Sequence, residues 1–189
     1  MKLRAQPLCR GLLLAFALPL AGCFDFEAPL GPATVPIDPR LLGQWRCMGF
    51  EESGTDRVGV IQFSALDKVQ YDVGPPPTCE GTDCMDRFRA HITKIAGMTL
   101  LNARELKDGK PDEKWNFVRY TFYRPNILHL DLVSDDVLKV KPETTETLRR
   151  AFEKQRKDPR LFEDYLICVK VVPKEAAPAA SPTATPAAP

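Results

Sequence analysis

Short segments in which apolar and polar residues alternate fill the central part of the chain, residues 41–172. The clearest is 87–95, where Phe88, Ala90 and Ile92 fall on one side and charged or polar residues on the other. Period-two alternation predicts strands that bury one face. Turn signals separate the segments, the strongest being a Lys-Asp-Gly-Lys-Pro sequence. The predicted strands cover 44–50, 58–63, 69–73, 87–95, 98–101, 115–123, 127–133 and 165–172.

One predicted helix interrupts these strands. Apolar residues recur at helical spacing between 148 and 155, and pairs of opposite charge four residues apart support the same segment. Thr144 or Thr145 is expected to cap its start, and Asp-Pro at 158–159 ends it. We therefore predict a mainly β (α+β) fold, in which a curled or closed antiparallel sheet is packed by one helix before the last strand.

Gly43-Gln44-Trp45, at the start of the first predicted strand, is similar to the G-x-W sequence that opens lipocalin-type barrels. The resemblance implies a half or full barrel with a cavity for a small lipophilic ligand. The chain departs from that family because its helix precedes the last predicted strand, whereas lipocalins place theirs after the eighth strand. The alternative is that Trp45 is a core aromatic at the base of a barrel or sandwich.

The first 22 residues have the three parts of an export signal. Lys2, Arg4 and Arg10 precede an apolar run at 11–20, and small residues follow it. The run is too short to span a bilayer as a helix. It ends in Leu20-Ala21-Gly22-Cys23, which resembles the lipobox of bacterial lipoproteins. The alternative is an ordinary signal peptide with a chance cysteine near the cleavage point.

Membership of the lipoprotein class implies that the Cys23 thiol carries two fatty acyl chains such as palmitate and that the leader is cut just before it. Two or three acyl chains hold a protein on a membrane durably without a spanning segment. Phe24, rather than Asp, follows the cysteine. By analogy with enterobacterial lipoproteins, this implies the outer membrane, with the protein facing the periplasm.

The sequence divides into four parts on this interpretation: a signal peptide at 1–22, the lipidated Cys23 with a Pro-rich tether at 23–40, one β-rich domain at 41–172, and a tail at 173–189. Four prolines at 24–39 predict an extended spacer between membrane and domain. The tail holds five prolines and seven alanines and is expected to be disordered, because it cannot bury enough apolar surface to offset ordering.

Four cysteines remain once Cys9 leaves with the leader and Cys23 is lipidated. An even number in an exported domain predicts disulfides, and three pairings are conceivable. We predict a local bond between Cys79 and Cys84 and, by elimination, a bond between Cys47 and Cys168 that joins the first strand to the last. The second bond requires Cα atoms within about 7 Å, which a closed sheet provides.

No metal or cofactor is predicted. Glu80 and Asp83 inside the Cys79–Cys84 loop and Asp86 just after it offer oxygen ligands, yet structural zinc sites contain more Cys or His ligands, and the spacing of an EF-hand is absent. His91 and His129 are the only histidines, each on the polar side of a predicted strand, so we expect two surface histidines. Nucleophile-elbow, metalloprotease and phosphate-loop motifs are missing, and no residue stands out as catalytic.

Charge excludes a dedicated nucleic-acid binder. Loss of the leader's three basic residues from the chain's 26 leaves 23, against 25 acidic ones, whereas nucleic-acid binding needs a basic face. Two function classes stay open: a membrane-anchored binding or assembly accessory with an envelope protein as partner, and a carrier of a small lipophilic ligand. The ligand-contacting residues are not identified by any motif. Aromatic residues are expected to line the interior or to fill it as core: Trp45, Tyr71, Phe88, Trp115 and Phe117.

Overall fold

Each predicted strand segment corresponds to a strand in the computed structural model, which describes residues 26–49, 58–79, 85–141 and 143–172. The leader, Cys23, Cys84 and the predicted tail lie outside the described residues. The strands are β1 (Gly43–Gly49), β2 (Val58–Ala65), β3 (Gln70–Gly74), β4 (Phe88–Ile95), β5 (Met98–Lys107), β6 (Lys110–Pro111), β7 (Asn116–Arg124), β8 (Ile127–Val133) and β9 (Phe162–Lys170).

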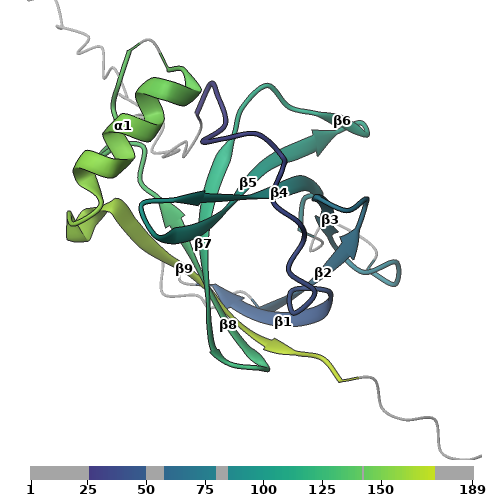
Figure 1. Ribbon diagram of the computed structural model, residues 1–189. Helices are drawn as coiled ribbons and strands as arrows, with labels where there is room; N and C mark the ends of the chain where they lie inside the picture. Colours follow the sequence, from purple (N-terminus) through teal and green to yellow (C-terminus); the bar gives the residue numbers. More distant parts are fainter. Residues whose placement is uncertain (1–25, 50–57, 80–84, 142, 173–189) are drawn as a thin grey trace, which may run out of the picture.

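Eight of these strands close into an antiparallel barrel (Figure 1). Their order is β4-β3-β2-β1-β9-β8-β7-β5, and pairing of β4 with β5 along the whole of β4 completes the circle. The two-residue β6 is attached to β5 outside this circle. The first and last strands, β1 and β9, are therefore neighbours. The predicted mainly β fold with one helix before the last strand is confirmed.

The alternation seen in the sequence divides the side chains between the two faces of the barrel wall. Phe88, Ala90 and Ile92 of β4 belong to the interior core cluster, as the pattern predicts. Their neighbours face outward, but much of this outer face is covered: Thr93 of β4 and Asn102 of β5 are buried. Coverage on both faces explains why the polar side of some strands is not a solvent-exposed surface.

The helix and the N-terminal segment form this outer layer. Helix α1 (Thr145–Gln155) and the 3₁₀ turn η1 (Pro159–Leu161) lie between β8 and β9. Thr144 is the N-cap, and its side chain and that of Thr147 accept from each other's backbone N–H in a capping box. A second apolar cluster joins helix, barrel wall and N-terminus: Phe26, Leu30, Ile95, Leu100, Phe117, Val133, Leu138, Leu148, Phe152 and Leu161.

The described part of the Pro-rich segment differs from the expected spacer, because it lies against the barrel. Phe26 and Leu30 are buried to 1% and 0% exposure, and Val35 bridges to Ile92 of β4. Figure 1 shows this segment, in purple, crossing β4 on its way into β1. The segment bends several times along the wall, and its few apolar side chains pack against the outer face of the barrel.

Residues 37–42 close one end of the barrel, which we call the base. The backbone N–H of Asp38 donates to the Tyr71 hydroxyl, and the Tyr120 hydroxyl donates to an Asp38 carboxylate oxygen at 3.4 Å. The Trp45 indole N–H donates to the Leu41 carbonyl at 2.7 Å. Leu41, Trp45 and Tyr71 are fully buried. The base is therefore filled by side chains and sealed by the incoming chain.

The described helices include none that is both long enough and apolar enough to cross a lipid bilayer.

Candidate functional site

A cavity of about 410 Å³ lies inside the barrel. Seven of the eight barrel strands contribute to its lining, so it belongs to the barrel interior rather than to a surface groove. Among the described residues, the lining consists of Ile61, Phe63, Val73, Met85, Phe88, Ala90, Leu101, Ala103, Glu105, Asn116, Val118, Leu130, Leu132, Tyr165 and Leu166.

The cavity lies at the end opposite the base. Its lining includes the last residues of β5 and β8 and the first residues of β4 and β7, which share that end in an antiparallel barrel. Val73, Phe88, Val118 and Leu132 point inward yet are only half-buried, whereas inward residues at the base such as Leu128 are fully buried. We call this end the rim.

The lining is almost entirely apolar, and Glu105 and Asn116 are its two strongly polar side chains. Glu105 and Asn116 lie on neighbouring strands near the rim. Glu105 belongs to β5, and Asn116 of β7 pairs with Ala103 of β5. The Lys107 ammonium lies 3.7 Å from the Glu105 carboxylate. Tyr165, also in the lining, is largely desolvated, and this burial raises the pKa of its hydroxyl. Such a cavity can bury an apolar body and meet a polar group at its mouth.

Only one of the five aromatic residues expected to line or fill the interior lies in the cavity wall. Phe88 does so, and Trp45 and Tyr71 fill the base. The expectation is wrong for the other two: Phe117 points outward and stacks on Phe26 with ring centroids 4.3 Å apart, and Trp115 meets His91 edge-on outside the barrel. Asn116 at the start of β7 takes the inward position, so its aromatic neighbours on either side face out.

Aliphatic side chains make most of the cavity wall, and the sequence analysis did not single them out. Their inward direction follows from strand alternation. That the space between them stays open does not follow from alternation, because it depends on where small inward-facing residues such as Ala90 and Ala103 stand in the wall. These two alanines lie directly opposite on β4 and β5.

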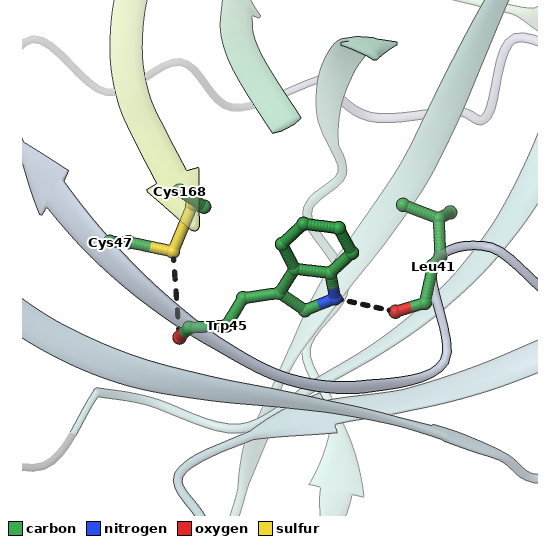
Figure 2. The surroundings of a disulfide bond; sticks show 4 residues. All are labelled: Leu41, Trp45, Cys47 and Cys168. Carbon is green, nitrogen blue, oxygen red and sulfur yellow. Dashed lines mark hydrogen bonds between the residues drawn. A yellow bond between two sulfur atoms is a disulfide. The ribbon is translucent and has the colours of Figure 1, made fainter. Parts of the chain in front are cut away.

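The predicted disulfide between Cys47 and Cys168 is present (Figure 2). The two residues are direct partners of β1 and β9, with Cα atoms 3.9 Å apart. Both are buried inside the barrel, and the Cys47 sulfur lies 3.8 Å from the Trp45 carbonyl oxygen. Cys79 is also in a disulfide, and its predicted partner Cys84 lies outside the described residues.

A second cluster lies on the outer wall, over β8 and β9. Among the described residues it is the one group of metal-ligand side chains that comes together: His129, Asp131 and Asp164 have donor atoms within 4.8 Å of one another. Each imidazole nitrogen faces its own carboxylate, Nδ1 toward Asp131 at 3.3 Å and Nε2 toward Asp164 at 3.4 Å. The Arg119 guanidinium donates to the second Asp131 oxygen at 2.8 Å. We interpret this arrangement as a polar network of side chains, because the two carboxylates face different ring nitrogens and Arg119 already bonds Asp131.

The expectation of two surface histidines is wrong. Both do face outward from the barrel, but His91 and His129 are 7% and 8% exposed. The N-terminal segment covers His91, whose Nε2 lies 2.8 Å from the Gly31 carbonyl oxygen, and desolvation there lowers the pKa of the imidazole. The Tyr123 ring stacks on His129. Tertiary cover of an outer face is not visible in strand periodicity.

A further hollow of about 550 Å³ lies beside the end of α1, with Asp136, Asp158 and Arg160 in its wall. Asp158 and Arg160 pair with each other, and Asp136 pairs with Lys139. Three of its charged groups are thus already paired, Glu163 adds a further carboxylate to the wall, and the lining is less apolar than that of the barrel cavity. The barrel cavity is the better candidate for a binding site.

A scan of the chain against protein-family models found no match. A search of curated proteins found no relative at the level of significance required. Among solved structures, a redesigned β-barrel is similar at 12% sequence identity with a TM-score of 0.39, over 75% of this chain and 99% of that one. The barrel is defined by its own strand pairings.

Proposed function

We propose that this protein is a lipid-anchored component of the bacterial cell envelope whose barrel binds a small apolar ligand. The observation that carries the proposal is the cavity at the rim. Ligand pockets in proteins span about 300 to 1,000 Å³ and are mostly apolar with a few polar groups. The cavity, at about 410 Å³ with Glu105 and Asn116 near its mouth, fits this description.

The energetic argument follows from the lining. An apolar molecule gains about 25 cal/mol for each Å² of its surface removed from water. The barrel wall is held in place by eight paired strands and a disulfide, so little ordering of the protein opposes binding. Gly43-Gln44-Trp45 suggested a lipocalin-like carrier. Two observations support that suggestion: Trp45 lies at the closed base, and the cavity lies at the other end of the barrel.

The anchor is the second part of the proposal. Leu20-Ala21-Gly22-Cys23 supports lipidation at Cys23 and placement in the envelope, most simply at the outer membrane facing the periplasm. Substitution Cys23→Ala followed by cell fractionation tests it. Loss of the mature protein from the membrane fraction is expected; a variant that keeps both its mature size and its membrane association contradicts the anchor.

Ligand binding is tested with the chain from Phe24 to Pro189, which contains every described residue and carries no acyl chain. A neutral naphthylamine fluorophore, which brightens in apolar surroundings, serves as probe. Ala103→Phe places a ring in the cavity and is expected to weaken binding about tenfold or more, equivalent to about 1.4 kcal/mol. Thr121→Phe adds the same ring on the exposed outer wall of β7 and should leave binding unchanged.

Saturable binding that responds to Ala103→Phe and not to Thr121→Phe supports the proposal. Absence of binding, or equal binding by both variants, contradicts it. Since a new ring can disturb packing, Val73→Phe on β3, two strands from Ala103 around the barrel wall, provides a second obstruction. Thermal unfolding of each variant shows whether the barrel is intact.

One observation favours the assembly accessory as a second candidate. Met48, Ile167 and Val169 are 38% to 48% exposed on the outer wall of β1 and β9, and Met48 pairs directly with Ile167. Adjacent exposed apolar side chains of this kind mark contact surfaces. A role in assembly predicts that Ile167→Glu abolishes the effect of the protein in cells that lack the native gene product, whereas Ala103→Phe preserves it. If Ala103→Phe abolishes that effect and Ile167→Glu preserves it, the effect depends on the cavity.

A further inference from the structure

Phe26, the first described residue, and the mouth of the cavity lie at the same end of the barrel. Phe26 and Trp115 exchange both backbone hydrogen bonds, each 2.8 Å long. Trp115 immediately precedes Asn116, which lines the cavity near its rim. The first described residue of the chain is therefore fixed beside the rim, far along the barrel from the base that the same segment later seals.

Only a short length of chain joins Phe26 to Cys23. Two residues, Phe24 and Asp25, separate Cys23 from Phe26, and the three steps from one Cα to the next cover at most about 3.6 Å each in an extended chain, or about 11 Å. Phe26 is itself immobilised: it is buried, its ring stacks on Phe117, and the next backbone N–H donates to the Glu143 carboxylate at 2.8 Å. An acyl group on Cys23 therefore brings the rim to the membrane surface.

The distribution of polarity in the cavity matches an amphiphile. Deep lining residues such as Leu101 and Leu130 are apolar, whereas Glu105 and Asn116 lie near the rim, where the Lys107 ammonium pairs with Asp112 and lies 3.7 Å from Glu105. A molecule with an apolar chain can insert the chain and leave its head group among these polar side chains. Membrane lipids have this construction, and they are the ligands that an anchored rim meets first.

We infer that the cavity takes up a fatty acyl chain from the membrane to which Cys23 tethers the protein. This inference rests on the proposed function and narrows its ligand to acyl lipids. Two sources supply the same chemistry. One is a lipid of the bilayer; the other is an acyl chain of the anchor itself, which begins within about 11 Å of the described chain.

The first experiment uses the acyl-free chain from Phe24 to Pro189 and vesicles of phosphatidylethanolamine and phosphatidylglycerol that contain a pyrene-acyl phospholipid. Uptake is measured as pyrene fluorescence that stays with the protein after the vesicles are removed. Saturable uptake near one lipid per protein is expected. Ala103→Phe and Val73→Phe should each reduce uptake about tenfold or more, and Thr121→Phe should not change it.

The second experiment separates the two sources. Mature lipidated protein is purified from membranes, unfolded, and its released lipids are quantified by mass spectrometry. A bilayer source predicts about one non-covalent lipid per wild-type protein and a loss of this lipid in Ala103→Phe. An anchor source predicts no released lipid, and uptake of pyrene lipid by the acyl-free chain but not by the lipidated wild-type protein.

Each negative result has a distinct meaning. If the acyl-free chain binds the neutral fluorophore but takes up no pyrene lipid, the acyl inference is overturned and the proposed ligand cavity stands. If it binds neither, both fail. If pyrene lipid is taken up equally by wild type and Ala103→Phe, the lipid binds outside the cavity and the inference is overturned as well.

Discussion

Cys47 and Cys168 are direct partners across β1 and β9, and their disulfide closes a span of 121 residues inside the barrel. This one bond joins the first strand to the last at the point where the chain completes the barrel. In the chain-entropy account, a closure of this length stabilises the fold by about 4 to 5 kcal/mol, because it restricts the unfolded chain.

The double variant Cys47→Ala, Cys168→Ala should therefore lose about 4 kcal/mol of unfolding free energy, measured by urea denaturation. The matched control is Cys79→Ala, Cys84→Ala, which removes a bond predicted to close only a short loop and should lose about 2 kcal/mol. Peptide mapping without reduction checks the pairing directly. Recovery of Cys47 joined to Cys79 or Cys84 contradicts both the bond and the closed barrel.

Tyr71 at the base is expected to make the fold sensitive to alkali. Burial raises the pKa of Tyr71 to about 12, from about 10 in an unfolded chain. The folded state thus holds the proton more tightly, so this contribution to stability is complete below pH 10 and is lost as the pH rises toward 12. Urea denaturation across this range should show a smaller decline for Tyr71→Phe, with the exposed Tyr123→Phe as control.

If the unfolding free energy declines equally with pH in wild type and in Tyr71→Phe, the proposed role of Tyr71 at the closed end of the barrel is contradicted. Absorbance titration of phenolate gives an independent check, because Tyr71 should ionise only near the pH at which the barrel opens.

Asp131 should be more important for stability than its neighbour Asp164. Asp131 is 1% exposed and bonded to Arg119, with His129 beside it. Hydrogen bonds to charged groups contribute about 1.5 to 3 kcal/mol, so Asp131→Asn should destabilise the fold by about 2 kcal/mol. The Asp164 side chain is 71% exposed, and Asp164→Asn should change stability by no more than about 0.5 kcal/mol. Equal effects of the two variants in urea denaturation contradict the network described here.

The capping box of α1 provides a local test. Thr144→Ala removes the side-chain oxygen that accepts from the Thr147 N–H at 3.2 Å and should cost about 1 kcal/mol of stability. Thr145→Ala changes the next residue, which is not the cap, and should cost less. Thermal unfolding of the two variants measures both losses. A larger loss of stability for Thr145→Ala than for Thr144→Ala would contradict Thr144 as the cap.

The strands and the long-range disulfide could be predicted because they follow from local alternation and from counting cysteines. Phe88, Ala90 and Ile92 face the interior as their spacing requires, and the interval between Cys47 and Cys168 allows a bond only if the sheet closes. The helix was visible from its charge pairs and its cap. These features depend on neighbours in the sequence or on a simple constraint on the ends of the sheet.

The outer layer and the cavity could not be predicted in this way. The segment that carries Phe26 and Leu30 has few apolar residues and many prolines, so it resembles a spacer until its partners on β5 and β7 are known. His91 is covered by Gly31 and Trp115, which are distant in sequence, and His129 by Tyr123 across the turn between β7 and β8. Whether the interior is filled or open depends on the sizes of the side chains that point into it, such as the adjacent small residues Ala90 and Ala103, and periodicity carries no such information.

The central claim is that an apolar ligand enters the barrel at the rim, and methyl NMR of the acyl-free chain during titration with a soluble short-chain phospholipid tests it most directly. The account predicts saturable shifts confined to methyl groups of the cavity wall: Val73, Leu101, Val118, Leu130, Leu132 and Leu166. Methyl groups of the base, such as Leu128, and of the outer wall, such as Val169, should stay unperturbed. Shifts confined to Met48, Ile167 and Val169, or no shifts at all, would contradict the account.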